Sequence, residues 1–123
     1  MDSGLELDNW IGRSIDVVVD RPLGSHHPDH ADLIYEVNYG FVPGTVAPDG
    51  EPIDAYVLGP DHALDYCTGE VVAIIRRRDD IEDKLVVALS GQWDRASIAA
   101  ATAFQEQYFD SSVEMPAEKD KQR

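Results

Sequence analysis

Short apolar runs separated by turn-forming residues make up the hydrophobic pattern as far as residue 89. Runs of about four to eight apolar or β-branched residues, bounded by Gly, Pro, Asn or Asp, are typical of strands. The pattern predicts strands at residues 14–20, 33–38, 41–46, 52–58, 69–76 and 84–89. Pro43 favours an edge position for the third strand, because proline cannot donate a hydrogen bond to a neighbouring strand.

After residue 89 the pattern changes to a helical period. Apolar residues between Ile98 and Tyr108 are spaced along one face of a helix, which predicts a helix over residues 97–109. Asp94 and Ser97 compete as its N-cap, since both have side-chain oxygens that accept from backbone N–H groups.

Several strands followed by one helix predict a mainly β, α+β fold. We expect a small closed or half-closed barrel of five to six strands, with the C-terminal helix packed on it. The chain has 123 residues, enough for one ordinary core. We assign residues 1–115 to a single domain and residues 116–123 to a polar, flexible tail.

The remaining composition indicates a soluble protein of a reducing compartment. The single cysteine, Cys67, leaves no internal disulfide, so the cytoplasm is the expected location. No apolar run approaches the ~20 residues that a membrane-spanning helix needs. The first ten residues are acidic, and we therefore expect no secretory signal there.

The formal net charge of −14 narrows the choice of partners. Nucleic acid and anionic membranes are bound mainly through Lys and Arg, so neither is an expected partner. A phosphate-bearing ligand would need metal ions that invert the local charge. The simpler explanation for the acidity is solubility alone.

An acidic turn is the first candidate for chemistry. Asp49, Glu51 and Asp54 place three carboxylates within six residues, and hard cations such as Mg²⁺ bind such oxygen ligands. Side chains alternate along a strand, so a bend at Gly50 or Pro52 is needed before all three can converge. The alternative is an acidic hairpin tip without a ligand.

A second acidic cluster lies between the last two predicted strands. Asp79, Asp80, Glu82 and Asp83 are flanked by Arg76–Arg78 and by Lys84. If the two clusters face each other, they can hold more than one metal, and two metals can activate water at a phosphoryl centre. The alternative is a charged loop in which arginines and aspartates neutralise each other.

Three segments resemble the soluble family I inorganic pyrophosphatases. Residues 38–59, NYGFVPGTVAPDGEPIDAYVLG, resemble the signature region of that family. Residues 71–89, with an acidic loop before a Lys and an apolar strand, resemble its next segment. Residues 104–109, FQEQYF, are similar to the final helix motif Phe-x-Glu-x-Tyr-Lys. Together the resemblance covers roughly residues 14–110.

The resemblance implies an OB-like barrel, dependence on Mg²⁺ with Mn²⁺ as a substitute, and hydrolysis of pyrophosphate to two phosphates. It places the metal ligands at Asp49, Glu51, Asp54, Asp79 and either Glu82 or Asp83. The attacking water would be oriented by Glu51 or Asp54. The implied substrate-binding residues are Arg21, Tyr39, Lys84 and Tyr108, with Tyr35 as a structural or substrate-side tyrosine. A homo-oligomer is also implied.

The chain departs from the family where phosphate is bound. A longer family segment that supplies a Lys and an Arg is compressed here into residues 20–33, DRPLGSHHPDHADL. Phe109 stands in place of a Lys, and one of Arg76–Arg78 could compensate, although alternate residues there must point away from the site. His26, His27 and His30 are either phosphate or metal ligands or uncommitted loop residues.

These departures leave two alternatives to pyrophosphate hydrolysis. The chain could hydrolyse another small phosphoanhydride with the same metals. It could also be a catalytically weak relative that binds metal and phosphate. The missing Lys and Arg residues distinguish these alternatives. An active pyrophosphatase needs other cationic residues in their place, whereas a weak or inactive relative does not.

Overall fold

The computed structural model describes residues 5–78 and 82–116. Its elements are, in chain order, α1 (Leu7–Trp10), β1 (Ser14–Arg21), β2 (Asn38–Val42), β3 (Ile53–Leu58), β4 (Tyr66–Arg77), β5 (Lys84–Ala88), α2 (Arg95–Glu106) and β6 (Ser111–Glu114). Within these described ranges, neither helix has the length and apolar character needed to cross a membrane.

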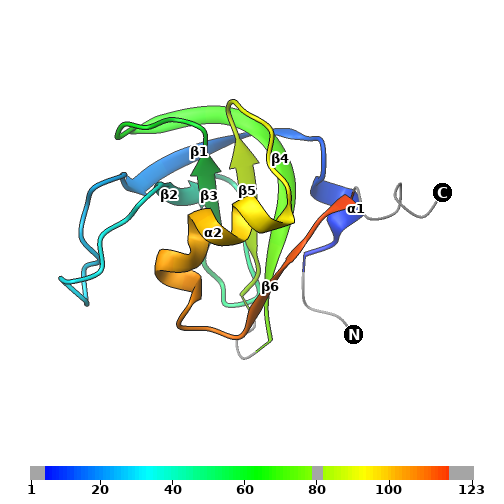
Figure 1. The fold of residues 1–123 in the computed structure, drawn as a ribbon. Coiled ribbons are helices and arrows are strands. Elements are labelled where there is room, and N and C mark those ends of the chain that lie inside the picture. Colours follow the sequence, from blue (N-terminus) through cyan, green and yellow to red (C-terminus); the bar gives the residue numbers. More distant parts are fainter. Residues whose placement is uncertain (1–4, 79–81, 117–123) are drawn as a thin grey trace.

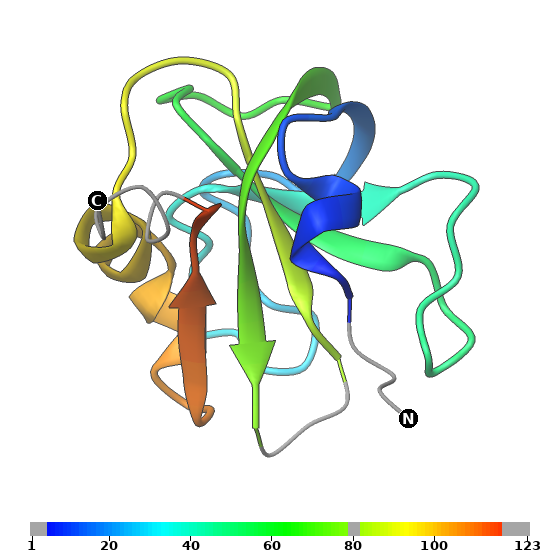
Figure 2. The same cartoon turned by 90° about the vertical axis from the view of Figure 1, so that its right-hand side faces the viewer.

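Five strands close into a barrel in the order β1-β2-β3-β5-β4, and β4 pairs with β1 to complete the ring. β3 and β5 run parallel, whereas the other neighbouring strands are antiparallel. β6 adds a further strand along the second half of β4, beside which it lies in Figure 2. The predicted barrel of five to six strands with a packed helix is confirmed.

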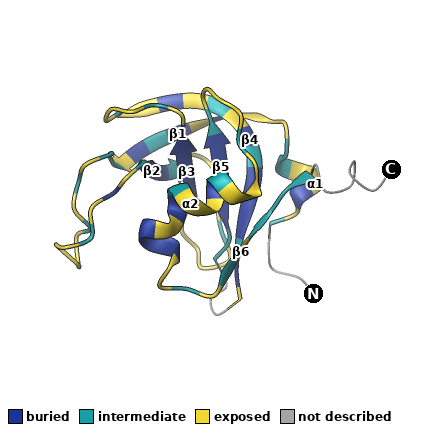
Figure 3. Ribbon diagram, viewed as in Figure 1, coloured by how far each residue is buried: buried dark blue, intermediate teal, exposed yellow. Residues whose placement is uncertain are grey.

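The sheet carries an apolar core on each side. One core fills the barrel and includes Val17, Val57, Val71, Leu85 and Val87. The other lies between the barrel wall and α2 and includes Tyr35, Tyr56, Leu58, Ile75, Ile98 and Phe104. α2 crosses the outside of β3 and β5 in Figure 1, and Figure 3 shows buried residues in both strands. Burial on both faces explains why β3 and β5 are almost continuously apolar in sequence.

The segment between β1 and β3 differs most from the prediction. Residues 33–37 form no strand apart from the isolated bridge of Ile34 with His26, and the expected strand at 41–46 is replaced by β2, which starts and ends earlier. The physical reason for the first difference is that the backbone of residues 33–35 bonds back to residues 24–27 within the same loop. β2 ends at Val42 because the chain turns there, with Gly44 at a φ of 82° and the Thr45 hydroxyl donating to the Val42 carbonyl.

Several other boundaries shift. β4 begins at Tyr66, three residues before the strand predicted at 69–76, and α2 starts and ends earlier than the predicted 97–109. Asp94 and Ser97 are partners in a capping box and not competitors, because each side chain accepts from the backbone N–H of the other. β6 was not predicted, since its four residues, SSVE, are short and polar.

Gly40 lies where β2 passes so close to β1 that a side chain does not fit. A Cβ atom at residue 40 would lie 1.9 Å from the carbonyl oxygen of Val18. We expect Gly40→Ala to lower the free energy of unfolding by about 2–3 kcal/mol, because the backbone must move to relieve the clash. Urea unfolding followed by tryptophan fluorescence measures this loss. In the control Gly69→Ala, the new Cβ meets side-chain atoms of Val87 and Leu89 at 2.7 and 2.8 Å and reaches the backbone oxygen of Ala88 only at 3.1 Å. Equal losses in both variants would therefore contradict the explanation.

Candidate active site

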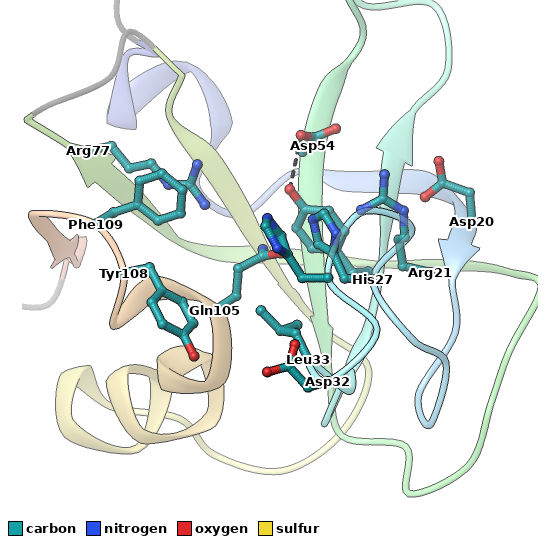
Figure 4. A pocket seen from close by; sticks show the side chains of 12 residues that line it. Asp20, Arg21, His27, Asp32, Leu33, Asp54, Arg77, Gln105, Tyr108 and Phe109 are labelled. Atoms are coloured by element: carbon teal, nitrogen blue, oxygen red, sulfur yellow. Dashed lines mark hydrogen bonds between the residues drawn. The ribbon is translucent and has the colours of Figure 1, made fainter.

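A cavity of about 540 Å³ lies between the barrel and the C-terminal end of α2. The strands contribute Asp20, Arg21, Tyr39, Asp54 and Arg77 to its walls. Figure 4 shows Arg21 and Asp20 on one side, Arg77 and Phe109 on the other, and Asp54 between them. The cavity thus places both cationic and acidic groups around one space.

Asp54 is the best-supported carboxylate of this cavity. Its Oδ2 accepts a hydrogen bond of 3.0 Å from the Tyr39 hydroxyl and one of 2.7 Å from Lys84 Nζ. The parallel register of β3 with β5 pairs Ala55 with Leu85, so the preceding residues, Asp54 and Lys84, lie side by side. Burial and the negative charge of Asp54 raise the pKa of Tyr39 well above its usual value, which keeps this hydroxyl a hydrogen-bond donor.

The two predicted acidic clusters meet through Asp49 and Glu82. The interaction between their carboxyl groups raises the pKa of Glu82 and lowers that of Asp49. Glu82 also accepts a hydrogen bond of 2.9 Å from Lys84, whose side chain is 3% exposed. Lys84 therefore bridges Glu82 and Asp54.

The chemistry of these donors fits a hard divalent cation. Asp49 and Glu82 interact with each other, Lys84 joins Glu82 to Asp54, and carboxylate oxygens are the preferred ligands of such a cation. In the part of the chain that the structure describes, no three His, Cys, Asp or Glu side chains converge on one point. Asp79, a predicted metal ligand, lies outside the described residues.

Two other predicted ligands lie apart from Asp54. Glu51 is exposed in the turn before β3, where its N–H donates to Asp49 Oδ1. Asp83 follows Glu82 but lies on the other side of the strand, because its Oδ2 accepts from Arg76 at 2.7 Å and from the N–H of Leu5 at 3.0 Å. The geometry brings Glu82, and not Asp83, to Lys84 and Asp49.

Three of the four predicted substrate-binding residues, Arg21, Tyr39 and Tyr108, line the cavity, whereas Lys84 is buried against Asp54 and does not line it. Arg21 donates a 2.9 Å hydrogen bond to the Tyr35 hydroxyl, which lies in the buried core. Tyr108 is 68% exposed and lies at the cavity wall. His27 and His30 also line the cavity. The ring of His26 instead bonds the carbonyl of Ala31 in the same loop.

Four cavity residues were not considered in the sequence analysis, namely Asp20, Asp32, Leu33 and Gln105, and Arg77 was considered only as one of three arginines that could replace the missing cations. The sequence indicated that Arg77 faces the opposite side of β4 from Arg76 and Arg78, since side chains alternate along an extended strand. Arg76 pairs with Asp83 and Glu114, whereas Arg77 faces the cavity. The sequence did not show which face of β4 carries the site, because both faces are apolar elsewhere.

Sequence comparison relates the chain to one enzyme family. The profile described as Inorganic pyrophosphatase matches residues 15–112. An inorganic pyrophosphatase of Caulobacter vibrioides is 38% identical over 52 residues, which are 40% of this chain and 29% of that protein. One of Halobacterium salinarum is 37% identical over 76 residues, 59% of this chain and 40% of that protein. The chain thus spans less than half the length of these curated relatives.

Solved structures give a longer match. The inorganic pyrophosphatase of Ehrlichia chaffeensis superposes with a TM-score of 0.66 at 15% identity, covering 98% of this chain and 95% of that chain. That of Neisseria gonorrhoeae gives a TM-score of 0.63 at 18% identity, with 98% and 91% covered. At this identity the likeness shows a common fold, and the predicted OB-like barrel is confirmed.

Proposed function

The chain belongs to the inorganic pyrophosphatase family, whose profile matches residues 15–112, and on this premise we propose that it hydrolyses pyrophosphate to two phosphates with Mg²⁺. The family implies a divalent metal cofactor. The observation that carries the proposal is the group formed by Asp54, Lys84 and Glu82, which joins both acidic clusters at the edge of a cavity lined by arginine.

Asp54 on one side, and Asp49 with Glu82 on the other, would supply ligands to one or more cations, and the family resemblance adds Glu51 and Asp79. When bound, a divalent cation polarises phosphoryl oxygens and makes a coordinated water more acidic. We choose Glu82 over Asp83 because Glu82 contacts Asp49 and Lys84, whereas Asp83 is paired with Arg76. Mn²⁺ would substitute, since it also binds carboxylate oxygens.

Asp54 would orient the attacking water. Both of its hydrogen bonds to protein end on Oδ2, so Oδ1 can accept a proton from a water molecule in the cavity. Tyr39 and Lys84 fix the carboxylate and prevent it from rotating, which holds the water in line with the phosphorus atom. Glu51, the other candidate for this role, lies in an exposed turn and lacks such support.

The phosphate groups would bind on the arginine side of the cavity. Arg21 is held by Tyr35 and can donate its remaining N–H groups to phosphate oxygens. Tyr108 is exposed at the wall and can donate its hydroxyl. Lys84 neutralises Asp54 and Glu82, and the family resemblance adds a phosphate contact for its ammonium group.

Phosphate release from pyrophosphate tests the proposal. We expect release with Mg²⁺ or Mn²⁺, and a loss of at least about 100-fold when EDTA removes the metal, because the unshielded site is acidic. Excess Mg²⁺ should restore the rate. Release that continues unchanged in EDTA would contradict the proposal, as would a folded protein without release in either metal. A nucleoside triphosphate, assayed in parallel, tests the alternative phosphoanhydride.

We further propose that the protein acts in the cytoplasm as a homo-oligomer. Cys67 is a free, buried thiol, which suits a reducing compartment. Val46 and Tyr66 are 75% and 56% exposed and provide apolar surface for a second copy of the chain.

A further inference from the structure

Arg77 is a buried cation in the wall of the active-site cavity. Only 8% of it is exposed, and it lines the cavity from the end of β4. Its neighbours in the chain face elsewhere: Arg76 pairs with Asp83 and Glu114, and Arg78 pairs with Asp110 on the surface. Among these three arginines, strand alternation directs Arg77 to the cavity.

Two contacts fix the guanidinium plane of Arg77. Nε and Nη2 donate to the two carboxylate oxygens of Glu106 at 3.1 and 2.6 Å, which is a bidentate geometry. The Phe109 ring lies below the guanidinium carbon, 3.7 Å from the ring centroid. A buried arginine held in this way loses little further freedom when it binds an anion.

The same buried network reaches Arg21 on the opposite wall. Consecutive hydrogen bonds with closest distances of 2.6 to 2.9 Å connect, in order, Arg21, Tyr35, Gln105, Tyr56, Glu106 and Arg77. Gln105 and Glu106 belong to the last turn of α2, so one helix end positions both guanidinium groups. In Figure 4 the two arginines lie on either side of Asp54.

The position of Arg77 also offers a replacement for the cation that is missing at residue 109. The resemblance places a Lys there, but the chain has Phe109, and the cation on this wall comes from Arg77 above the phenyl ring. Two guanidinium groups facing one cavity suit a ligand with two linked tetrahedral anions, since each guanidinium carries a permanent positive charge and five N–H donors.

We propose that Arg77 is a phosphate-binding residue, that it and Arg21 each hold one phosphate group of a diphosphate, and that Gln105 and Glu106 are its positioning residues. This inference rests on the proposed function, because it concerns the substrate of the same site. It adds a cation for which the family resemblance assigns no role.

Binding of methylenediphosphonate, a diphosphate that cannot be hydrolysed, tests the inference without turnover. Calorimetric titration in Mg²⁺ buffer compares the wild type with Arg77→Met combined with Glu106→Gln, so that no buried charge is left alone. We expect the affinity to fall roughly 10- to 100-fold, as for the loss of a charge-assisted hydrogen bond. Adding Phe109→Lys to this double variant should recover most of the loss. The matched control Arg78→Met removes the neighbouring surface arginine and should change the affinity less than about twofold.

A conservative variant keeps the test valid if the double variant does not fold. Arg77→Lys retains a charge beside Glu106 but loses the fork, and we expect about 5- to 10-fold weaker binding with a cooperative thermal transition. Wild-type affinity in both Arg77 variants would overturn the inference, as would a folded wild type that does not bind the diphosphonate. If the wild type binds it through Arg77 but releases no phosphate from pyrophosphate, the inference stands and the proposed function fails.

Discussion

Replacing Asp54 with Asn is expected to lower kcat for pyrophosphate hydrolysis by about 100-fold or more while the protein stays folded. The amide has the same shape and can still accept from Tyr39 and Lys84. It cannot take a proton from water, and general-base catalysis contributes about 10²- to 10⁴-fold. Initial rates of phosphate release measure the loss, and circular dichroism verifies the fold.

Asp83→Asn is the matched control for this substitution. Asp83 is the neighbouring carboxylate that pairs with Arg76 on the other side of the strand. We expect its rate to fall less than about tenfold, because this side chain contacts Arg76 and the backbone of Leu5 and not the reacting groups. A rate for Asp54→Asn above one third of the wild type, or an equal loss at Asp83, would contradict the assignment.

Replacing Glu106 with Ala is expected to lower the free energy of unfolding by about 3–5 kcal/mol, because it leaves Arg77 charged and buried without its carboxylate. Both side chains of this ion pair are 6% exposed. The Tyr56 hydroxyl, which donates to Glu106 at 2.7 Å, also loses its acceptor. Urea unfolding at neutral pH measures the change.

An exposed pair of the same type serves as its control. Arg78 and Asp110 are 2.8 Å apart with side chains 63% and 59% exposed. Asp110→Ala should cost less than about 1 kcal/mol, because water screens the pair. The explanation fails if the two substitutions cost the same, or if Glu106→Ala is no worse than the double variant in which Arg77 is also replaced.

The strands that could be predicted are those whose apolar or β-branched runs end at clear turn residues, whether both faces are buried, as in β3 and β5, or only one, as in β1. The runs at 14–20, 52–58 and 84–89 agree with β1, β3 and β5 to within one residue at each end. The bounds of β2 could not be predicted, because residues 33–35 bond back to residues 24–27 within their own loop and a turn at Gly44 ends the strand at Val42. β6 depends on the free edge of β4, which a local pattern does not reveal.

The candidate site could likewise be predicted only in part from the sequence. The carboxylates were visible in the sequence because charged residues in turns are conspicuous. The contact between Asp54 and Lys84 follows from the parallel pairing of β3 with β5, two strands separated in the chain by β4. The choice between Glu82 and Asp83 likewise needed the side of the strand on which each lies. Which strands pair, and which side of the sheet each side chain faces, are decided by the tertiary structure. The alternation of side chains along a strand shows which residues share a face, but not which face carries the site.

The position of Lys84 has a consequence for the order in which the chain folds and binds a cation. Its buried ammonium group already balances Asp54 and Glu82, so repulsion between these carboxylates does not oppose closure of the barrel. In small zinc domains, by contrast, binding of the metal supplies the energy of folding. A newly made chain with this internal counter-ion can complete its barrel first and take up a cation later, which makes its maturation independent of how much metal the cell holds at that moment.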